Sequence, residues 1–388
     1  MPMLTMTAIQ EALKNFYLPS MVTQINEKTD PFMAAMSKGS ESVSGSKIIM
    51  ALRYGRNGGV GNRADDGDLP TPSSRKTKQA KWETKNLFAR IMLTDKTMKA
   101  SANSRGAFVD ILEAELEDAM MDAKENFARQ LYGDGSGVIT ACKANTAVNT
   151  VLVDSTIALA EGMLIDIVTS STGVVLAAAR EITQVDHIAG SITISGAAVT
   201  TATTHGVTVA GSYGLEMTGL AKILTPDTTI YEIDRSSNKW MNPNVFAAAG
   251  ALSENTIQKG IDAAEIAAGS EIDFMIGSHG VRRAYIYLFN TQKRVVNTID
   301  LKGGWKALDY NGVGLTASKY MPAGALYQLA SKDFKMYQMS EFDWLDKDGA
   351  VLSRVANKAA YEATLYKYAD IGCSRIKGQT KITGITEY

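Results

Sequence analysis

The sequence predicts an α+β fold in which long, extended elements are attached to a compact body. Three observations support this: apolar residues recur at helical spacing from 104 to 132, two stretches of alternating polarity flank a polar tract between 47 and 95, and the composition changes abruptly between 138 and 212. The chain has 388 residues, 45% of them hydrophobic, so it can bury a large core and is long enough for two or three compact units.

The two alternating stretches predict the arms of a long hairpin. They are KIIMALRYGR (47–56) and KWETKNLFARIMLTD (81–95), and the tract between them is rich in Gly, Pro and charged residues. This tip is far longer than the usual hairpin loop of about 2–5 residues. Because it offers almost no large apolar side chain, we expect it to need a partner outside its own domain.

The helical pattern predicts one helix from Ser104 to about Tyr132, which would be roughly 43 Å long. Gly133 is expected to end it in a left-handed conformation. The GDGSG sequence that follows suggests a phosphate-binding loop. However, phosphate sites lie before a helix, where free N–H groups point outward, so this one is interpreted as a helix stop.

Residues 138–212 are poor in charge and rich in Thr, Val, Ala and Ile, with short apolar runs separated by Gly and Ser. This pattern predicts a small antiparallel β unit, either a barrel or a sandwich. After Gly214 we expect helices at 252–269 and 279–294 around a buried strand at 271–278, followed by a tail that alternates strands with turns.

Composition excludes several classes of function. The formal net charge of -1 argues against a protein that wraps nucleic acid, and two distant cysteines argue against a disulfide framework. No apolar run approaches the ~20 residues that span a bilayer, so we expect no membrane contact. The N-terminus lacks a basic patch followed by an apolar stretch, so we expect no signal peptide.

No active site is predicted. His187, His205 and His279 lack the spacing of metal ligands, and Cys142 and Cys373 have no obvious base nearby in the sequence. We therefore expect no catalytic residue, no metal and no cofactor.

In their order, these elements resemble a tailed-phage major capsid protein of the Hong Kong 97 type. The resemblance rests on the helix ending in LYGDGSG, on LEMTGLAKIL (215–224) after the β unit, and on FMIGSHGVRRA, YNGVGLTASKYMPAGALYQLA and YEATLYKYADIGC in the C-terminal half. It covers nearly the whole chain apart from residues 138–212.

The resemblance implies an N-terminal arm, an extended β-loop that reaches over a neighbour, a long spine helix, and peripheral and axial domains, here with an inserted small all-β domain. The implied divisions are 1–46 (arm), 47–95 (extended hairpin loop), 96–137 (peripheral domain with spine helix), 138–213 (inserted β domain), 214–330 (axial domain), 331–358 (peripheral strands) and 359–388 (axial domain, C-terminal part).

The implied function is structural. Copies would assemble into hexamers and pentamers that form an icosahedral shell around the double-stranded DNA genome of a tailed phage, without sequence-specific DNA binding. The protein would be made in the host cytoplasm and reside in the virion, with a scaffolding protein, a portal and a decoration protein as partners. The candidate inter-subunit contacts, of mixed sign, are Arg53, Arg56, Arg63, Asp65, Asp66, Asp68, Arg75 and Lys76.

Two other functions stay open at this point. A bacterial nanocompartment shell of the encapsulin kind shares this fold, and an enzyme with an unrecognised active site is the second alternative. Some family members also fuse a loop lysine to an asparagine of another subunit. Lys76, Lys78, Lys81 and Asn357 are the residues to consider, but no motif matches them to that chemistry.

Overall fold

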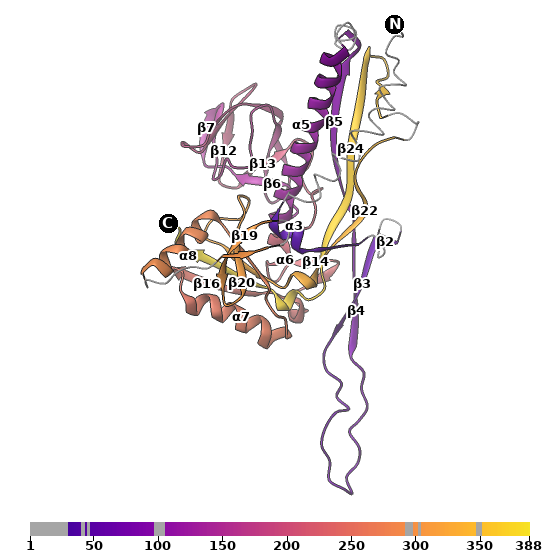
Figure 1. Ribbon diagram of the computed structural model, residues 1–388, viewed down its shortest axis with the longest axis vertical. Helices are drawn as coiled ribbons and strands as arrows, with labels where there is room; N and C mark the ends of the chain where they lie inside the picture. The colour runs from indigo at the N-terminus through magenta and orange to yellow at the C-terminus, as the bar shows by residue number, and fades with distance from the viewer. Residues whose placement is uncertain are drawn as a thin grey trace.

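The computed structural model describes residues 30–39, 43–44, 47–96, 105–291, 298–301, 304–346 and 351–388. The molecule is elongated (Figure 1): a hairpin extends from one end, a long helix with two long strands extends from the other, and two further units lie beside them. Most of the predicted arm, residues 1–29, lies outside the described residues. Within the described part, no helix has the length and apolar character needed to cross a bilayer.

A long sheet forms one face of the body. Its strands are β1 (Ser37–Gly39), β5 (Lys85–Thr94), β22 (Phe334–Trp344), β23 (Ser353–Arg354) and β24 (Ala360–Cys373). β24 is central, because it pairs with β5 along one edge and with β22 and β23 along the other.

The implied division groups residues 359–388 with the axial domain, whereas β24 lies in the long sheet with β5 and β22. Its ladder to β5 runs from Ala360↔Thr94 to Ala369↔Lys85, and Ala363 and Leu365 are buried in the core beneath the sheet. Of this segment, only β25 (Thr380–Ile385) joins the other large sheet. The alternation of buried and partly exposed residues along β24 fits a sheet with one covered face.

The predicted long helix is α5 (Arg105–Tyr132), which has 28 residues and is roughly 42 Å long. Its buried side chains repeat at helical spacing, and the ring of Phe127 packs edge-on against Phe342 of the long sheet, 5.7 Å between centroids. The buried residues of α5 are Leu116, Met120, Ala123, Phe127, Ala128, Leu131 and Tyr132, together with the polar Arg129 and Gln130.

The expectation for Gly133 is wrong, because the positive φ lies at Gly135 and Gly137 instead. The helix end is covered by Gly219, where an added Cβ would collide with the carbonyl oxygens of Gln130 and Gly133. The absence of a side chain at Gly219 thus lets the chain pass close to the helix end.

The hairpin consists of β3 (Lys47–Tyr54) and β4 (Lys76–Glu83), with β2 (Val43–Ser44) on the outer side of β3. Its second arm is therefore 76–83, whereas residues 85–94, predicted to belong to that arm, form β5 and pair with β24. The turn at Thr84 moves the chain from one sheet to the next.

A second large sheet has seven strands in the order β16-β25-β21-β17-β20-β19-β18. Its strands are β16 (Asn244–Gly250), β17 (Phe274–Gly277), β18 (Thr298–Asp300), β19 (Lys306–Tyr310), β20 (Val313–Ala317), β21 (Leu326–Leu329) and β25. The helices α7 (Glu254–Ala268) and α8 (His279–Thr291) pack on it, and β17 is buried on both faces. Shorter elements of this part are α6 (Leu220–Ile223), β14 (Thr229–Ile230), β15 (Ile233–Asp234), η2 (Lys239–Met241), η3 (Ser331–Asp333) and η4 (Ile376–Gly378).

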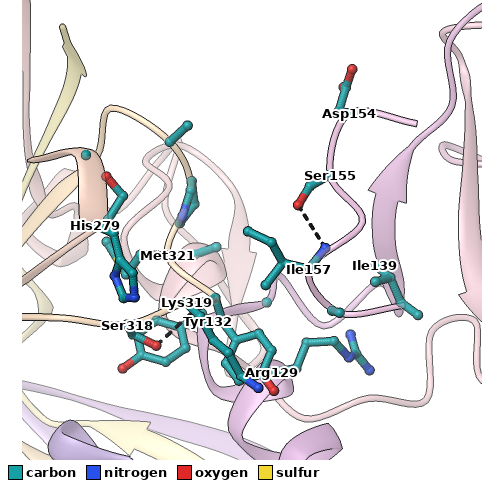
Figure 2. A pocket seen from close by; sticks show the side chains of 18 of the residues that line it. Arg129, Tyr132, Ile139, Asp154, Ser155, Ile157, His279, Ser318, Lys319 and Met321 are labelled. Atoms are coloured by element: carbon teal, nitrogen blue, oxygen red, sulfur yellow. Dashed lines mark hydrogen bonds between the residues drawn. The ribbon is translucent and has the colours of Figure 1, made fainter. Parts of the chain in front are cut away.

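The predicted β unit is a closed barrel with its own core. Six strands run in the order β6-β13-β9-β10-β11-β8, and a bridge between Cys142 and Val153 joins the first to the last. The strands of the unit are β6 (Val138–Ala141), β7 (Asn145–Val148), β8 (Thr150–Leu152), β9 (Leu164–Thr169), β10 (Val175–Asp186), β11 (Ser191–Ile194), β12 (Val199–Thr201) and β13 (His205–Val209). A cleft of ≈ 680 Å³ separates the barrel from the loops around α8 (Figure 2).

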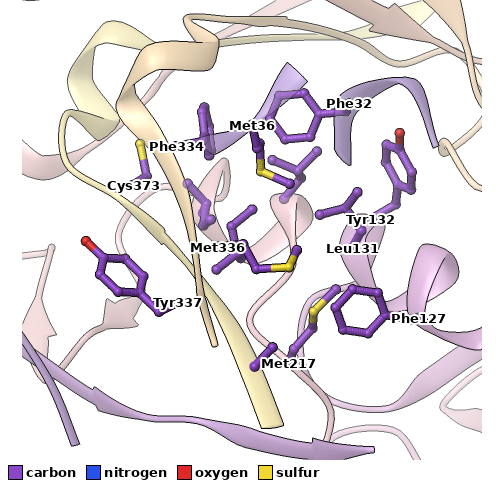
Figure 3. Close-up of a cluster of buried hydrophobic side chains, with 14 of the residues drawn as sticks. Phe32, Met36, Phe127, Leu131, Tyr132, Met217, Phe334, Met336, Tyr337 and Cys373 are labelled. Carbon is purple, nitrogen blue, oxygen red and sulfur yellow. The ribbon is translucent and has the colours of Figure 1, made fainter. Parts of the chain in front are cut away.

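The main core joins the long sheet, α5 and one face of the seven-stranded sheet (Figure 3). Residues 30–39, the described end of the implied arm, contribute to it. Phe32, in the short helix α3 (Pro31–Ala35), is fully buried between Phe274 and Phe334, at 5.5 and 5.2 Å between ring centroids. Asp30 caps α3 and accepts a hydrogen bond from the Tyr132 hydroxyl at 2.8 Å.

Candidate subunit interface

The base of the hairpin is part of the main core. Alternate residues of its two strands point inward, so Ile48, Leu52, Ala80 and Trp82 are buried while Arg53 is exposed. This matches the alternation in KIIMALRY, and it fixes the direction in which the hairpin leaves the body.

Aromatic contacts hold this base in place. Trp82 lies against Tyr231 and Tyr337, at 4.2 and 5.3 Å between ring centroids. Farther out, the ring of Tyr54 stacks on Trp240, and the Lys78 ammonium donates to Asn238 Oδ1 at 3.2 Å. Beyond Tyr54 and Lys76 the two strands no longer pair.

Among the described residues, the hydrogen bonds of the tip, residues 55–75, stay within the tip itself. Gly58 N donates to Ser73 Oγ at 2.6 Å, and Arg63 Nε donates to the Asp68 carbonyl at 3.0 Å. Val60 and Leu69 are 80% and 87% exposed, so no apolar cluster stabilises the tip. The tip therefore has local turns but no core.

The structure places all the predicted contact residues on the surface of this hairpin. Arg53 and Lys76 lie on the paired strands, and the other six belong to the tip. All eight are exposed, and among the ion pairs of the described residues none involves them. The tip carries three Arg and three Asp, so it offers both signs of charge, and none of them forms an ion pair with another described residue.

Solved capsid structures resemble this chain over nearly its full length. The capsid asymmetric unit of cyanophage A-1(L) is 11% identical, with a TM-score of 0.59 and coverage of 96% of this chain and 94% of that one. The capsid of an empty GTA particle is 10% identical, with a TM-score of 0.51 and coverage of 92% and 91%. The chain has the Hong Kong 97-type capsid fold.

The holo-SrpI encapsulin complex from Synechococcus elongatus PCC 7942 also matches, at 10% identity and a TM-score of 0.47, covering 93% of this chain and 90% of that one. No protein-family model matches the sequence, and no curated protein sequence does. In this capsid fold the long helix α5 corresponds to the spine helix, and the β3–β4 hairpin corresponds to the extended loop.

A second exposed surface of the capsid fold was missed in the sequence. The outer face of the long sheet carries Phe88 and Met92, 56% and 50% exposed, beside Tyr366 and Tyr368 of β24. The rings of Phe88 and Tyr368 meet edge-on at 6.0 Å. The sequence signal for this surface is that KNLFARIMLT has large apolar residues on both of its faces. A strand with one face in solvent needs such residues on the other face alone.

Cys142 and His205 are neighbours in the barrel, where the Cys142 backbone N–H donates to the His205 carbonyl oxygen at 2.9 Å. Burial raises the pKa of the Cys142 thiol to about 11 and raises that of Cys373 further, so neither readily forms the reactive thiolate. His187 is hydrogen-bonded to Thr156, and His205 accepts from Ala202 N. In the described part of the chain, no group of three His, Cys, Asp or Glu side chains is arranged to hold a metal ion.

Proposed function

We propose that this chain is the structural major capsid protein of a tailed phage. Copies assemble into hexamers and pentamers that form an icosahedral shell around the double-stranded DNA genome. The observation that carries the proposal is the extended loop: its base is anchored by buried aromatic residues, while its tip is exposed and contacts no other part of the chain that the structure describes. Such a loop is stabilised when a neighbouring copy covers it.

The charged residues of the tip set how the loop meets that neighbour. Because the three Asp of the tip form one block between Arg63 and Arg75, a shifted position would place like charges together, so the pattern favours one register. A shell repeats each contact over many identical interfaces. Even about 1 kcal/mol per contact therefore changes the assembly equilibrium strongly.

We further propose the division of the subunit into domains. The long sheet with α5 forms the peripheral domain, and β24 is now included in it. The seven-stranded sheet with α7 and α8 forms the axial domain, whose copies meet at the symmetry axes, and residues 138–213 form the inserted domain.

The proposed partners follow from this role. A scaffolding protein guides assembly, a portal occupies one vertex, and a decoration protein binds the exterior of the shell. The near-neutral formal charge of -1 suits a shell that encloses DNA without gripping it, because tight phosphate binding needs a surplus of Lys and Arg. The protein is made in the host cytoplasm, ends in the virion and has no enzymatic role.

Expression of the full chain, with and without its scaffolding protein, tests the proposal. Negative-stain electron microscopy should show closed, icosahedral particles, and the gene should lie beside terminase and portal genes. A neighbouring gene for a peroxidase or a ferritin-like cargo would instead identify a nanocompartment shell. A monomer that turns over a substrate would contradict a structural role.

A further inference from the structure

A buried arginine shapes the segment that lies against the base of the extended hairpin. The Arg235 side chain is fully buried, and its guanidinium donates to five oxygen atoms, among them the Ile223 carbonyl at 2.7 Å from Nη1. The acceptors are the carbonyl oxygens of Lys222, Ile223, Thr225 and Thr228, together with Thr228 Oγ1. Because four of these five are backbone oxygens, the arginine fixes the path of residues 222–228.

Arg235 also closes a small hairpin whose turn is unfavourable. The strands β14 and β15 are joined by Tyr231 and Glu232, with φ 51° and 60°. Asn and Gly normally supply left-handed conformations at both positions of such a turn. Tyr and Glu keep them only where the surrounding contacts hold the backbone in place. At the open end of the hairpin, Arg235 Nε donates to the Thr228 carbonyl at 3.0 Å, so the guanidinium supplies one of these contacts.

The same segment contacts the extended hairpin at three points along its paired strands. The contacts are Tyr231 on Trp82, Asn238 on Lys78 and Trp240 on Tyr54. The carbonyl of Tyr231 also accepts from Lys81 N at 3.0 Å, and the Asn238 amide donates to the Asp234 carbonyl at 2.6 Å. Because the three points are spread from the core to the end of β3, a change in the shape of the segment would tilt the hairpin.

We propose that Arg235 is a positioning residue for the extended loop. It holds residues 222–242 in the shape that presents Tyr231, Asn238 and Trp240 to the hairpin, and it thereby fixes the direction of the tip. Since the tip continues beyond the paired strands, a small tilt at the base moves it by a larger distance. This role rests on the proposed capsid function, in which the tip must reach a neighbouring copy.

The direction of the hairpin can be measured in the unassembled subunit. Spin labels on Thr77→Cys, near the outer end of β4, and on Ile266→Cys of α7 give the distance between hairpin and body, since Cys142 and Cys373 are 1% and 0% exposed and stay unlabelled. The distribution should be narrow in the otherwise native chain, and Arg235→Lys should broaden it roughly twofold. Lysine keeps the charge, but its ammonium has fewer donors than the planar guanidinium and cannot reach the same oxygens.

Arg129→Lys is the matched control. Arg129 is also a buried arginine, but its described hydrogen bonds go to Glu216 and Asn126 and not to the segment beside the hairpin. Its distance distribution should equal that of the native chain. Equal broadening by both variants, or an unchanged distribution in Arg235→Lys, would overturn the proposal.

A second variant keeps the buried arginine in place, so it does not depend on how well Arg235→Lys folds. Asn238→Ala/Trp240→Leu removes two contacts made by partly exposed side chains, and it should broaden the same distribution. A narrow, unshifted distribution would show that the segment does not direct the hairpin. Because these distances are measured before assembly, they test the role of Arg235 separately from the capsid function, which microscopy of the native chain tests.

Discussion

The ring of Tyr54 lies flat on the indole of Trp240, with 4.5 Å between centroids and 1° between planes. Tyr54 is the last residue of β3 before the unpaired tip, and Trp240 belongs to η2 in the body. This stack is therefore the outermost aromatic contact of the hairpin, and it sets the angle at which the loop leaves the subunit.

Replacing Tyr54 by Ala should affect assembly more than folding. The free energy of unfolding should fall by about 1 kcal/mol, the value of one aromatic pair, because the buried base around Trp82 remains. The subunit concentration required for shell formation should rise several-fold, since the loop samples more directions. Urea denaturation and light scattering measure the two effects.

Tyr54→Phe is the control for this change, because it keeps the ring and loses only the hydroxyl. It should assemble like the wild type. Normal assembly of the Ala variant would show that the stack does not orient the loop.

The stability of the subunit should depend on pH through Asp370. Burial raises the pKa of this carboxyl from 3.8 to about 7, despite hydrogen bonds from Thr218 and Ile371 N. The folded state thus binds this proton more tightly than the unfolded state. Its contribution to the free energy of unfolding is complete below pH 3.8 and is lost as the pH rises to about 7.

The variant Asp370→Asn mimics the protonated carboxyl and keeps its acceptor oxygen. At pH 8 it should be more stable than the wild type by on the order of 1–2 kcal/mol, and the difference should shrink toward pH 4. Urea unfolding at several pH values provides the comparison. A variant that is destabilised equally at every pH would mean that the charged carboxylate is the stabilising form.

Excision of the barrel should leave a folded subunit. Because Gly214 N and the Ser136 carbonyl are hydrogen-bonded, a linker of about two residues can replace 137–213 without moving the stems. Circular dichroism should retain the signal of α5, and the separate barrel core predicts that residues 137–213 also fold alone. Unfolding of both pieces would show that they stabilise each other.

Much of this fold is predictable because the periodicity of apolar residues in the sequence indicates its helices and strands. Leu116, Phe127 and Leu131 share one face of α5, and that face is buried as their spacing indicates. The alternation in β3 likewise identifies Ile48 and Leu52 as inward-facing. The abrupt change in composition marks the barrel, although only the bridge between its end strands distinguishes a barrel from a sandwich.

The errors arose where distant segments decide the outcome. β24 alternates in a way that suits either sheet, and its place depends on β5, which lies far away in the sequence. The same holds for Phe32, whose pocket is built by Phe274 and Phe334, both far along the chain. For the loop, the sequence predicts an exposed, charged tip, but the surface that we propose receives it belongs to another copy.

The most direct test of the account is to remove the tip. Since Tyr54 pairs with Lys76, an Asn-Gly turn can replace residues 55–75 and close the hairpin with little strain. The free energy of unfolding should change by no more than about 0.5 kcal/mol, because the tip is exposed and belongs to no core cluster of the described residues. Sedimentation and negative-stain microscopy at matched concentration should then show soluble subunits or loose capsomers and no closed shells. Closed particles in normal yield from this variant would contradict the claim that the loop joins the subunits.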